Sequence, residues 1–171
     1  MLTVCLLLTG CTKTRKAART ADVQPEIFPD YKGVTVPVNI APLNFMIDGA
    51  EHIQATFIVG GEELATVCGS EGVVDIAVDE WQEMTAKAAG KTIEVEVSMW
   101  NDNYPDGIKY KPFSVNVSKD EIDPWIAYRL IEPGYESWRY MGIYQRELSS
   151  FDEDEIITNK TSKSACVNCH N

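Results

Sequence analysis

The residues best suited to do chemistry stand at the carboxy end of the chain. Cys166 and Cys169 are separated by two residues and His170 follows at once, which gives the spacing C-x-x-C-H. Two thiols at this spacing can each add to one vinyl group of the same porphyrin, and the adjacent imidazole can ligate the iron. The pattern predicts a covalent c-type haem, with Cys166 and Cys169 as thioether positions and His170 as an iron ligand.

Two other interpretations of the pair stay open. A structural zinc site needs about four nitrogen or sulfur ligands. His52 and Cys68 are the remaining His or Cys beyond the amino-terminal pair, and neither has metal-ligand spacing. A thioredoxin-like dithiol would open a helix after a strand, whereas this pair follows a polar stretch. Haem is therefore the favoured prediction, and a Cys166–Cys169 disulfide is its main alternative.

The amino terminus has the pattern of a targeting segment. Residues 2–8 form an apolar run that is too short to span a bilayer, and the run ends in Leu8-Thr9-Gly10-Cys11. This tetrapeptide resembles the lipobox of bacterial lipoproteins, which implies cleavage before Cys11 and acylation of its thiol. No Lys or Arg precedes the run, which departs from ordinary signal peptides. We expect a signal peptide over 1–10 and a lipid-anchored tether over 11–26.

The number of cysteines agrees with export. Of the five cysteines, Cys5 belongs to the expected signal, Cys11 takes lipid, and Cys166 with Cys169 take haem. Cys68 is left over and is expected to be a small buried apolar residue. Haem of this type is attached outside the cytoplasmic membrane, so both motifs indicate one location. That location is the periplasm or cell envelope, with the protein lipid-anchored to a membrane.

The charge balance excludes some classes of function. The 171 residues contain 26 acidic and 15 basic side chains, a formal net charge of −11. Nucleic acid is not an expected partner, because phosphate binding needs a basic face. Only His52 and His170 are present, so histidine acid–base catalysis has little material. An electron-transfer or binding protein is expected rather than an enzyme.

Residues 27–120 have the patterning of a β domain. Apolar residues alternate along 92–100, and strands over 54–59 and 63–68 flank the turn residues Gly60-Gly61. Pro37 indicates an edge strand and Pro112 an interruption in another strand. One short helix is expected, with Asp79 as its N-cap and Gly90 as its stop. The prediction is a mainly β, antiparallel, immunoglobulin-like sandwich with one short helix.

Aromatic residues concentrate in the next segment, over 121–150. Two strands, 125–131 and 138–144, are predicted to form a hairpin, and six of the sixteen aromatics lie between residues 125 and 144. Such residues usually form a core or pack against another domain, and a sugar-stacking face is the alternative. Residues 151–171 are expected to be a polar linker, including the acidic run 152–155, that leads to the haem motif.

Several stretches resemble one group of exported bacterial proteins. They are Ile27-Phe28-Pro29-Asp30-Tyr31, residues 35–45, residues 128–136, residues 141–146 and the final Cys-x-Asn-Cys-His. The group is that of TolB-like propeller proteins bearing a c-type haem motif. The resemblance implies that this chain corresponds to their amino-terminal region. It also implies a carboxy-terminal propeller that is missing from this chain.

The second axial ligand of the haem is the least determined residue. In small cytochromes it lies downstream of the motif, whereas only Asn171 follows here. The upstream residues of suitable type are Met141, Met99, Met84 and His52. Met141 is preferred because it is nearest in sequence, although a core methionine is the alternative. A ligand from the missing part, or a five-coordinate iron, also stays open.

Two functions follow from the sequence. The first is one-electron transfer to a redox partner protein, or haem-based sensing, by a periplasmic lipoprotein. The second is a non-catalytic immunoglobulin-like module that binds polysaccharide or protein, with Cys166–Cys169 as a disulfide. Visible absorbance separates them, because haem is coloured and a disulfide is not.

Overall fold

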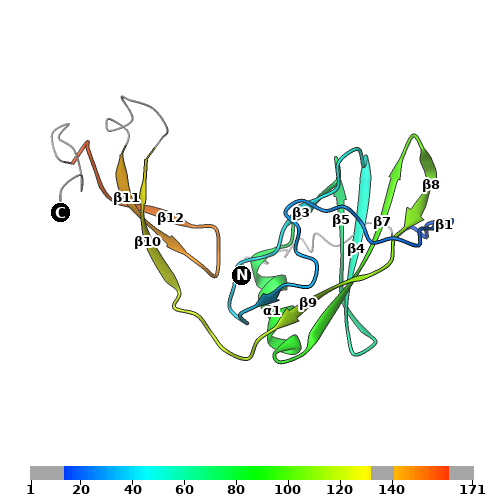
Figure 1. Cartoon of the computed structure of the whole chain (residues 1–171), viewed down its shortest axis with the longest axis horizontal. Coiled ribbons are helices and arrows are strands. Elements are labelled where there is room, and N and C mark those ends of the chain that lie inside the picture. Colours follow the sequence, from blue (N-terminus) through cyan, green and yellow to red (C-terminus); the bar gives the residue numbers. More distant parts are fainter. Residues whose placement is uncertain (1–13, 132–140, 162–171) are drawn as a thin grey trace, which may run out of the picture. The chain divides into compact units, whose positions relative to one another are not determined.

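The computed structural model describes residues 14–131 and 141–161. The chain divides into two compact units, each with its own sheet (Figure 1). Unit 1 comprises Met1–Val38 and Pro42–Asp120, and unit 2 comprises Asn39–Ala41 and Glu121–Asn171. The prediction of a mainly β protein with several sheets and one short helix is confirmed for the described residues.

Unit 1 is built on a seven-stranded sheet with a smaller ribbon and a helix. Its strands are β1 (Arg19–Thr20), β2 (Thr35–Val36), β3 (Phe45–Met46), β4 (His52–Val59), β5 (Glu62–Ser70), β6 (Val73–Val74), β7 (Thr92–Asn101), β8 (Tyr104–Lys109) and β9 (Phe113–Val117). The main sheet has the order β1-β8-β7-β4-β5, with β9 also pairing with β7 and β2 pairing with β9. The helix α1 spans Val78–Ala88.

The alternating strand predicted at 92–100 forms the middle of this sheet. β7 pairs antiparallel with β4 from Ile93↔Val59 to Trp100↔His52. Successive side chains of a strand point to opposite faces, so the apolar positions of β7 all reach the core. Ile93, Val95 and Val97 are each at most 1% exposed. β7 pairs directly with β4, β8 and β9 and is therefore the central strand of the sheet.

Turn residues and prolines act where the sequence predicted. The β4–β5 hairpin closes at Gly60 and Gly61, whose φ values of 60° and 86° suit glycine. β8 and β9 pair with successive parts of β7, and Pro112 lies between them. The predicted interruption is therefore confirmed, because proline has no N–H to give to the ladder.

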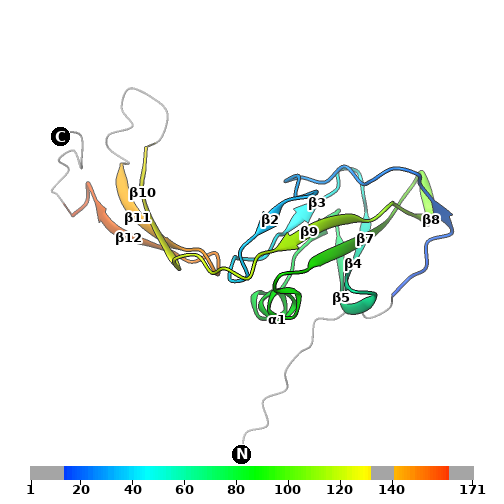
Figure 2. The same cartoon turned by 60° about the horizontal axis from the view of Figure 1, so that its bottom comes forward.

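A second layer covers one face of the main sheet. β3 pairs antiparallel with β6, and α1, which Figure 2 shows end-on, follows β6 in the chain. The rings of Phe45 and Phe113 meet edge-on at 5.9 Å, and those of Trp81 and Phe57 meet at 6.4 Å. Phe57 and Phe113 share one face of the sheet, since both pair with Val95. The ribbon and the helix thus cover the same face.

The predicted helix is present, but its N-cap prediction is wrong. Ala77 is the N-cap residue and has no side-chain capping hydrogen bond. Asp79 lies inside the first turn, where its carboxylate accepts a hydrogen bond from the backbone N–H of Glu80 at 3.0 Å. A carboxylate there still favours the helix, because the amino end carries partial positive charge. Gly90, with φ of 72°, follows the end of the helix as predicted.

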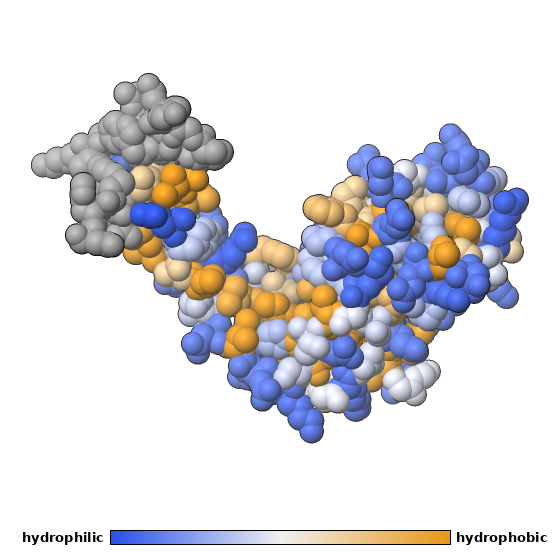
Figure 3. Space-filling view, in the orientation of Figure 1, coloured by the Kyte–Doolittle hydropathy of each residue, from blue (hydrophilic) through white to orange (hydrophobic). Residues whose placement is uncertain are grey.

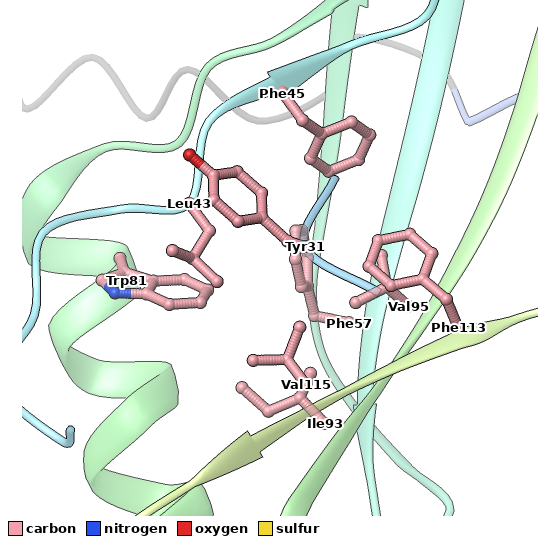
Figure 4. Close-up of a pocket in the computed structure, with 9 residues that line it drawn as sticks. All are labelled: Tyr31, Leu43, Phe45, Phe57, Trp81, Ile93, Val95, Phe113 and Val115. Atoms are coloured by element: carbon pink, nitrogen blue, oxygen red, sulfur yellow. The ribbon is translucent and has the colours of Figure 1, made fainter. Parts of the chain in front are cut away.

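The core of unit 1 leaves no room for a ligand. Figure 4 shows aromatic and aliphatic side chains around a void of about 10 Å³ between α1 and the sheet. The ring of Trp81 borders it from the helix and Phe113 from β9. A void of this size with apolar walls barely admits one water molecule. It is a packing defect and not a binding site.

Two edge strands depart from the antiparallel prediction. β1 pairs in parallel with β8, and β2 in parallel with β9. The expected tether also differs: the N–H groups of Ala18 and Ala21 donate to the carbonyls of Asp106 and Lys109 at 2.9 and 2.8 Å. An open sheet edge presents unpaired backbone groups that need partners. Residues 18–21, which the sequence assigned to a flexible tether, are held along that edge.

Unit 2 contains a three-stranded antiparallel sheet. Its strands are β10 (Trp125–Leu130), β11 (Gly142–Glu147) and β12 (Glu153–Thr158), in that order. The predicted hairpin corresponds to the pairing of β10 with β11, from Trp125↔Glu147 to Leu130↔Gly142. Its second strand runs on to Glu147, past the predicted end at 144, and residues 138–140 lie outside the described residues.

The acidic run forms the third strand, which the sequence did not predict. β12 contains Glu153, Asp154 and Glu155, expected to be a solvated linker. All three carboxylate residues are exposed, so that part of the prediction holds. The strand forms because Ile157 pairs with Ile143, with a bulge near Tyr144.

Candidate haem segment and the exposed sheet

The residues predicted to carry the chemistry lie outside the described residues. This applies to Cys166, Cys169 and His170, and also to Cys11. The structure instead describes the strand that leads to the haem motif. β12 ends at Thr158, which is 3% exposed and pairs with Gly142. The backbone N–H of Thr158 donates to Oγ1 of Thr161 at 2.9 Å, so the side chain of Thr161 secures the turn after β12.

Chain length sets how far the motif can be from this sheet. Cys166 is five residues beyond Thr161. An extended chain covers about 3.4 Å per residue, which gives a reach of roughly 17 Å. This length is an upper limit for the separation of Cys166 from Thr161.

Among the proposed iron ligands, Met141 is the one near the end of β12. It directly precedes β11, whose first residue pairs with Thr158, and it is 4% exposed. Met84 and Met99 are buried in unit 1, at 2% and 6% exposure. His52 is exposed at the start of β4. The assignment of Met141 as an iron ligand stays a prediction.

The sheet of unit 2 exposes large apolar side chains on both faces. Seven of the eleven exposed large hydrophobic residues of the described chain belong to this smaller unit: Trp125, Ile126, Leu130, Ile131, Phe151, Ile156 and Ile157. Neighbouring residues of a strand point to opposite faces, so Trp125 and Ile126 lie on different sides. Figure 3 shows apolar surface on this sheet beside hydrophilic residues. Such surface in a soluble protein marks a contact with another molecule or domain.

The described aromatics of this segment do not form a core. Trp125 is 45% exposed. Tyr128 and Tyr144 are half-buried and stack with ring centroids 6.2 Å apart. The hydroxyl of Tyr128 donates to the carboxylate of Glu153 across the sheet. The expectation of a core is thus wrong for Trp125, while packing against another domain stays a prediction.

Cys68 differs from its prediction in both exposure and bonding. It lies in β5, next to the buried Val67, so strand alternation turns it to the outer face of the sheet, where it is exposed. It is also disulfide-bonded. The other four cysteines lie outside the described residues, and each has a predicted role.

Other chemistry is sparse in the described ranges. Neither range holds a group of three or more His, Cys, Asp or Glu residues that could bind a metal. Burial raises the pKa of the Glu80 carboxyl, and the neighbouring Asp79 and Glu83 raise it further. Burial also raises the pKa of the Tyr110 hydroxyl, which donates to Sδ of Met99 at 3.5 Å. Neither group lies with a nucleophile or a metal-binding cluster.

Comparison with known proteins gives no family for the chain. No protein-family model, curated protein or solved structure matches it. Within residues 14–131 and 141–161, no helix is both long enough and apolar enough to cross a membrane.

Proposed function

We propose that the chain is an exported, lipid-anchored protein that carries one c-type haem and transfers single electrons in the periplasm. The observation that carries the proposal is the spacing of Cys166, Cys169 and His170. Leu8-Thr9-Gly10-Cys11 supports it, because lipidation and this kind of haem attachment occur on the same side of the membrane. Haem-based sensing would use the same site and is the alternative role if the chain has no electron-transfer partner.

Each residue has a defined role in this proposal. The thiols of Cys166 and Cys169 each add across a vinyl double bond, so sulfur bonds to one carbon and hydrogen to the other. His170 would hold the iron through its imidazole, and Met141 would contribute a thioether as a further iron ligand. The bound haem contributes one-electron redox chemistry, and the protein sets its potential through the ligands and their burial.

The exposed sheet of unit 2 would suit a chain in which a TolB-like propeller follows, as the resemblance implies. Apolar side chains are exposed on both faces of β10 to β12, and exposed apolar patches of this kind mark interfaces with another protein or domain. The TolB-like propeller implied by the resemblance would supply a β surface for one of them. The proposed partners are therefore the propeller and a soluble redox protein.

A visible spectrum with matched variants tests the haem proposal. The full chain is expressed in a host that matures c-type cytochromes, and a reduced-minus-oxidised difference spectrum is recorded. We expect a sharp reduced α-band in the wild type, and its loss in Cys166→Ala/Cys169→Ala. The control is Cys68→Ala, which changes a disulfide-bonded cysteine outside the C-x-x-C-H motif and should keep the band. A colourless wild-type protein would overturn the proposal.

The second candidate function is a protein-binding module without haem. It is favoured by the exposed aliphatic residues on the sheet of unit 2, such as Ile126, Leu130 and Ile156. Unit 1 would then be the immunoglobulin-like part, and Cys166–Cys169 a disulfide. Aliphatic groups favour a protein over a polysaccharide, because sugars stack on aromatic rings. Leu130→Lys should abolish capture of the partner while unit 1 stays folded, and an unchanged interaction would exclude this surface.

A further inference from the structure

A polar cavity lies on the outer face of the main sheet, opposite the core. Its volume is about 350 Å³, at the lower end of the range of small-molecule sites. Strand pairing explains which residues line it. Gln54 pairs with Ser98, Thr56 pairs with Glu96, and Ser98 in turn pairs with Lys109. These side chains of β4, β7 and β8 therefore share one face.

The segment before β1 forms the other wall. Thr14, Arg15, Lys16 and Ala17 line the cavity together with Thr20. The backbone N–H of Arg15 donates to Oε1 of Gln54 at 3.0 Å, which fastens the segment to the sheet. At its far end, Thr20 pairs with Lys109. The cavity thus exists because residues 14–20 are not a free tether.

The charges on the lining differ from those of the whole chain. The protein has a net charge of −11, but this cavity has three cations, Arg15, Lys16 and Lys109, against one carboxylate, Glu96. Lys109 is already paired with Glu96 at 2.6 Å. In the described ranges, neither Arg15 nor Lys16 has an ion pair with a carboxylate. Two cations are therefore available to an anion.

The other end of the lining offers hydrogen bonds. The carboxylate of Glu96 is an acceptor, and the hydroxyl of Ser98 can donate or accept. The hydroxyl of Thr56 already shares a hydrogen bond with that of Thr66 at 2.9 Å. The hydroxyl of Ser98 has no hydrogen-bond partner among the described residues and is not fully buried, so it can bond to a ligand in the cavity.

We propose that this cavity binds a small anion that also carries hydroxyl groups, such as a sugar phosphate or sugar acid. Arg15 and Lys16 hold the phosphate or carboxylate. Glu96 accepts from the hydroxyl groups of the ligand, and Ser98 exchanges a hydrogen bond with them. This site is separate from the haem motif and does not depend on it.

Calorimetric titration of the full chain with glucose 6-phosphate tests the site. Inorganic phosphate and glucose are titrated separately, to measure the two halves of the ligand. We expect a dissociation constant for glucose 6-phosphate of about 1 mM or tighter, and binding about tenfold weaker for phosphate. Glucose alone should bind more weakly still. The affinity for glucose 6-phosphate should fall with added salt, because the cations are exposed.

Variants separate the two ends of the site. Arg15→Gln/Lys16→Gln should weaken glucose 6-phosphate binding by about tenfold or more. Its fold should persist, because the backbone and not the guanidinium of Arg15 holds Gln54. Ser98→Ala should weaken glucose 6-phosphate but leave phosphate unchanged. Lys119→Gln, an exposed cation that does not line the cavity, is the charge control and should leave binding unchanged.

Three results would overturn the proposal. The first is no heat of binding for glucose 6-phosphate with a wild-type chain whose thermal unfolding is normal. The second is equal weakening by Lys119→Gln and by the double variant, which would indicate attraction by overall charge. The third is phosphate binding as tight as glucose 6-phosphate, which would remove the hydroxyl-binding end.

Discussion

At the residue scale, Met141 shows how one position serves two interpretations. Met141 is 4% exposed, which is expected both of a methionine packed in a core and of an iron ligand shielded from solvent. Met84 and Met99 are likewise buried, but in the core of unit 1. The two roles separate only when the sulfur is removed and the volume is kept.

Met141→Leu makes that separation. The change conserves volume and should cost less than about 1.5 kcal/mol of unfolding free energy. It removes the thioether, so the reduction potential should fall, because methionine ligation raises it. The haem itself should stay attached through Cys166 and Cys169. Met46→Leu, at a half-exposed methionine of unit 1, is the control, and an unchanged potential in Met141→Leu would assign Met141 to packing alone.

Tyr110 gives a pH-dependent prediction at the same scale. Its pKa is raised from 10.0, first by burial and then by Tyr104 and Glu26. A raised folded-state pKa means that the stabilisation is present below the unfolded-state pKa and is lost as the pH rises through the folded-state pKa. Wild-type unfolding free energy should therefore fall above about pH 10 more steeply than that of Tyr110→Phe. Denaturant titrations at several alkaline pH values check this, and parallel pH profiles would contradict it.

At the scale of elements, alternation and turn residues predicted the centre of unit 1 well. β7, the β4–β5 hairpin and the break at Pro112 were predicted from local sequence patterns and are present in the structure. β12 was missed because Glu153, Asp154 and Glu155 dominate its sequence, while its pairing depends on a strand distant in the sequence. β1 was missed for the same reason, since only the edge of β8 gives residues 19–20 a partner.

The site residues were predictable only in part. The C-x-x-C-H spacing is local and was evident from the sequence, whereas the exposure of Cys68 depends on which face of β5 it occupies. The cavity beneath residues 14–20 depends on a backbone contact between Arg15 and Gln54, which are far apart in sequence. No pattern within either segment indicates it.

Two hairpins of unit 1 provide a matched pair of glycine variants, Gly107 in the β7–β8 hairpin and Gly60 in the β4–β5 hairpin. Gly107 has φ of 82°, and a Cβ there would lie 2.3 Å from Nε1 of Trp100. Gly60 has φ of 60° and open space around its Cβ position. Gly60→Ala should cost about 1 kcal/mol for the backbone conformation alone. Gly107→Ala should cost about 1–3 kcal/mol more, because the indole of Trp100 must shift. Equal losses in chemical denaturation would contradict this packing.

At the scale of the whole molecule, the two units differ in what their sheets bury. The main sheet of unit 1 has one face covered by α1 and the β3–β6 ribbon. The described sheet of unit 2 has exposed apolar residues on both faces. Stability follows buried apolar area, so the two units should open independently and at different free energies.

Native-state hydrogen exchange measures this difference in the full chain. Amides of β4 and β7 should exchange with free energies close to that of global unfolding. Amides of β10 to β12 should exchange through a lower-energy opening, and their protection should rise when a partner or propeller covers the sheet. Uniform protection across both units would contradict the prediction that the sheet of unit 2 opens more easily than that of unit 1.

The mass of the exported full chain, measured under denaturing conditions, tests the central claim most directly. We predict the mature polypeptide with one haem covalently added, and peptide mapping should place it on Cys166 and Cys169. Denaturation removes haem that is bound only by its ligands, so a retained haem mass requires thioether bonds. A chain without haem mass, with Cys166 or Cys169 in a disulfide to each other or to Cys68, would contradict the account.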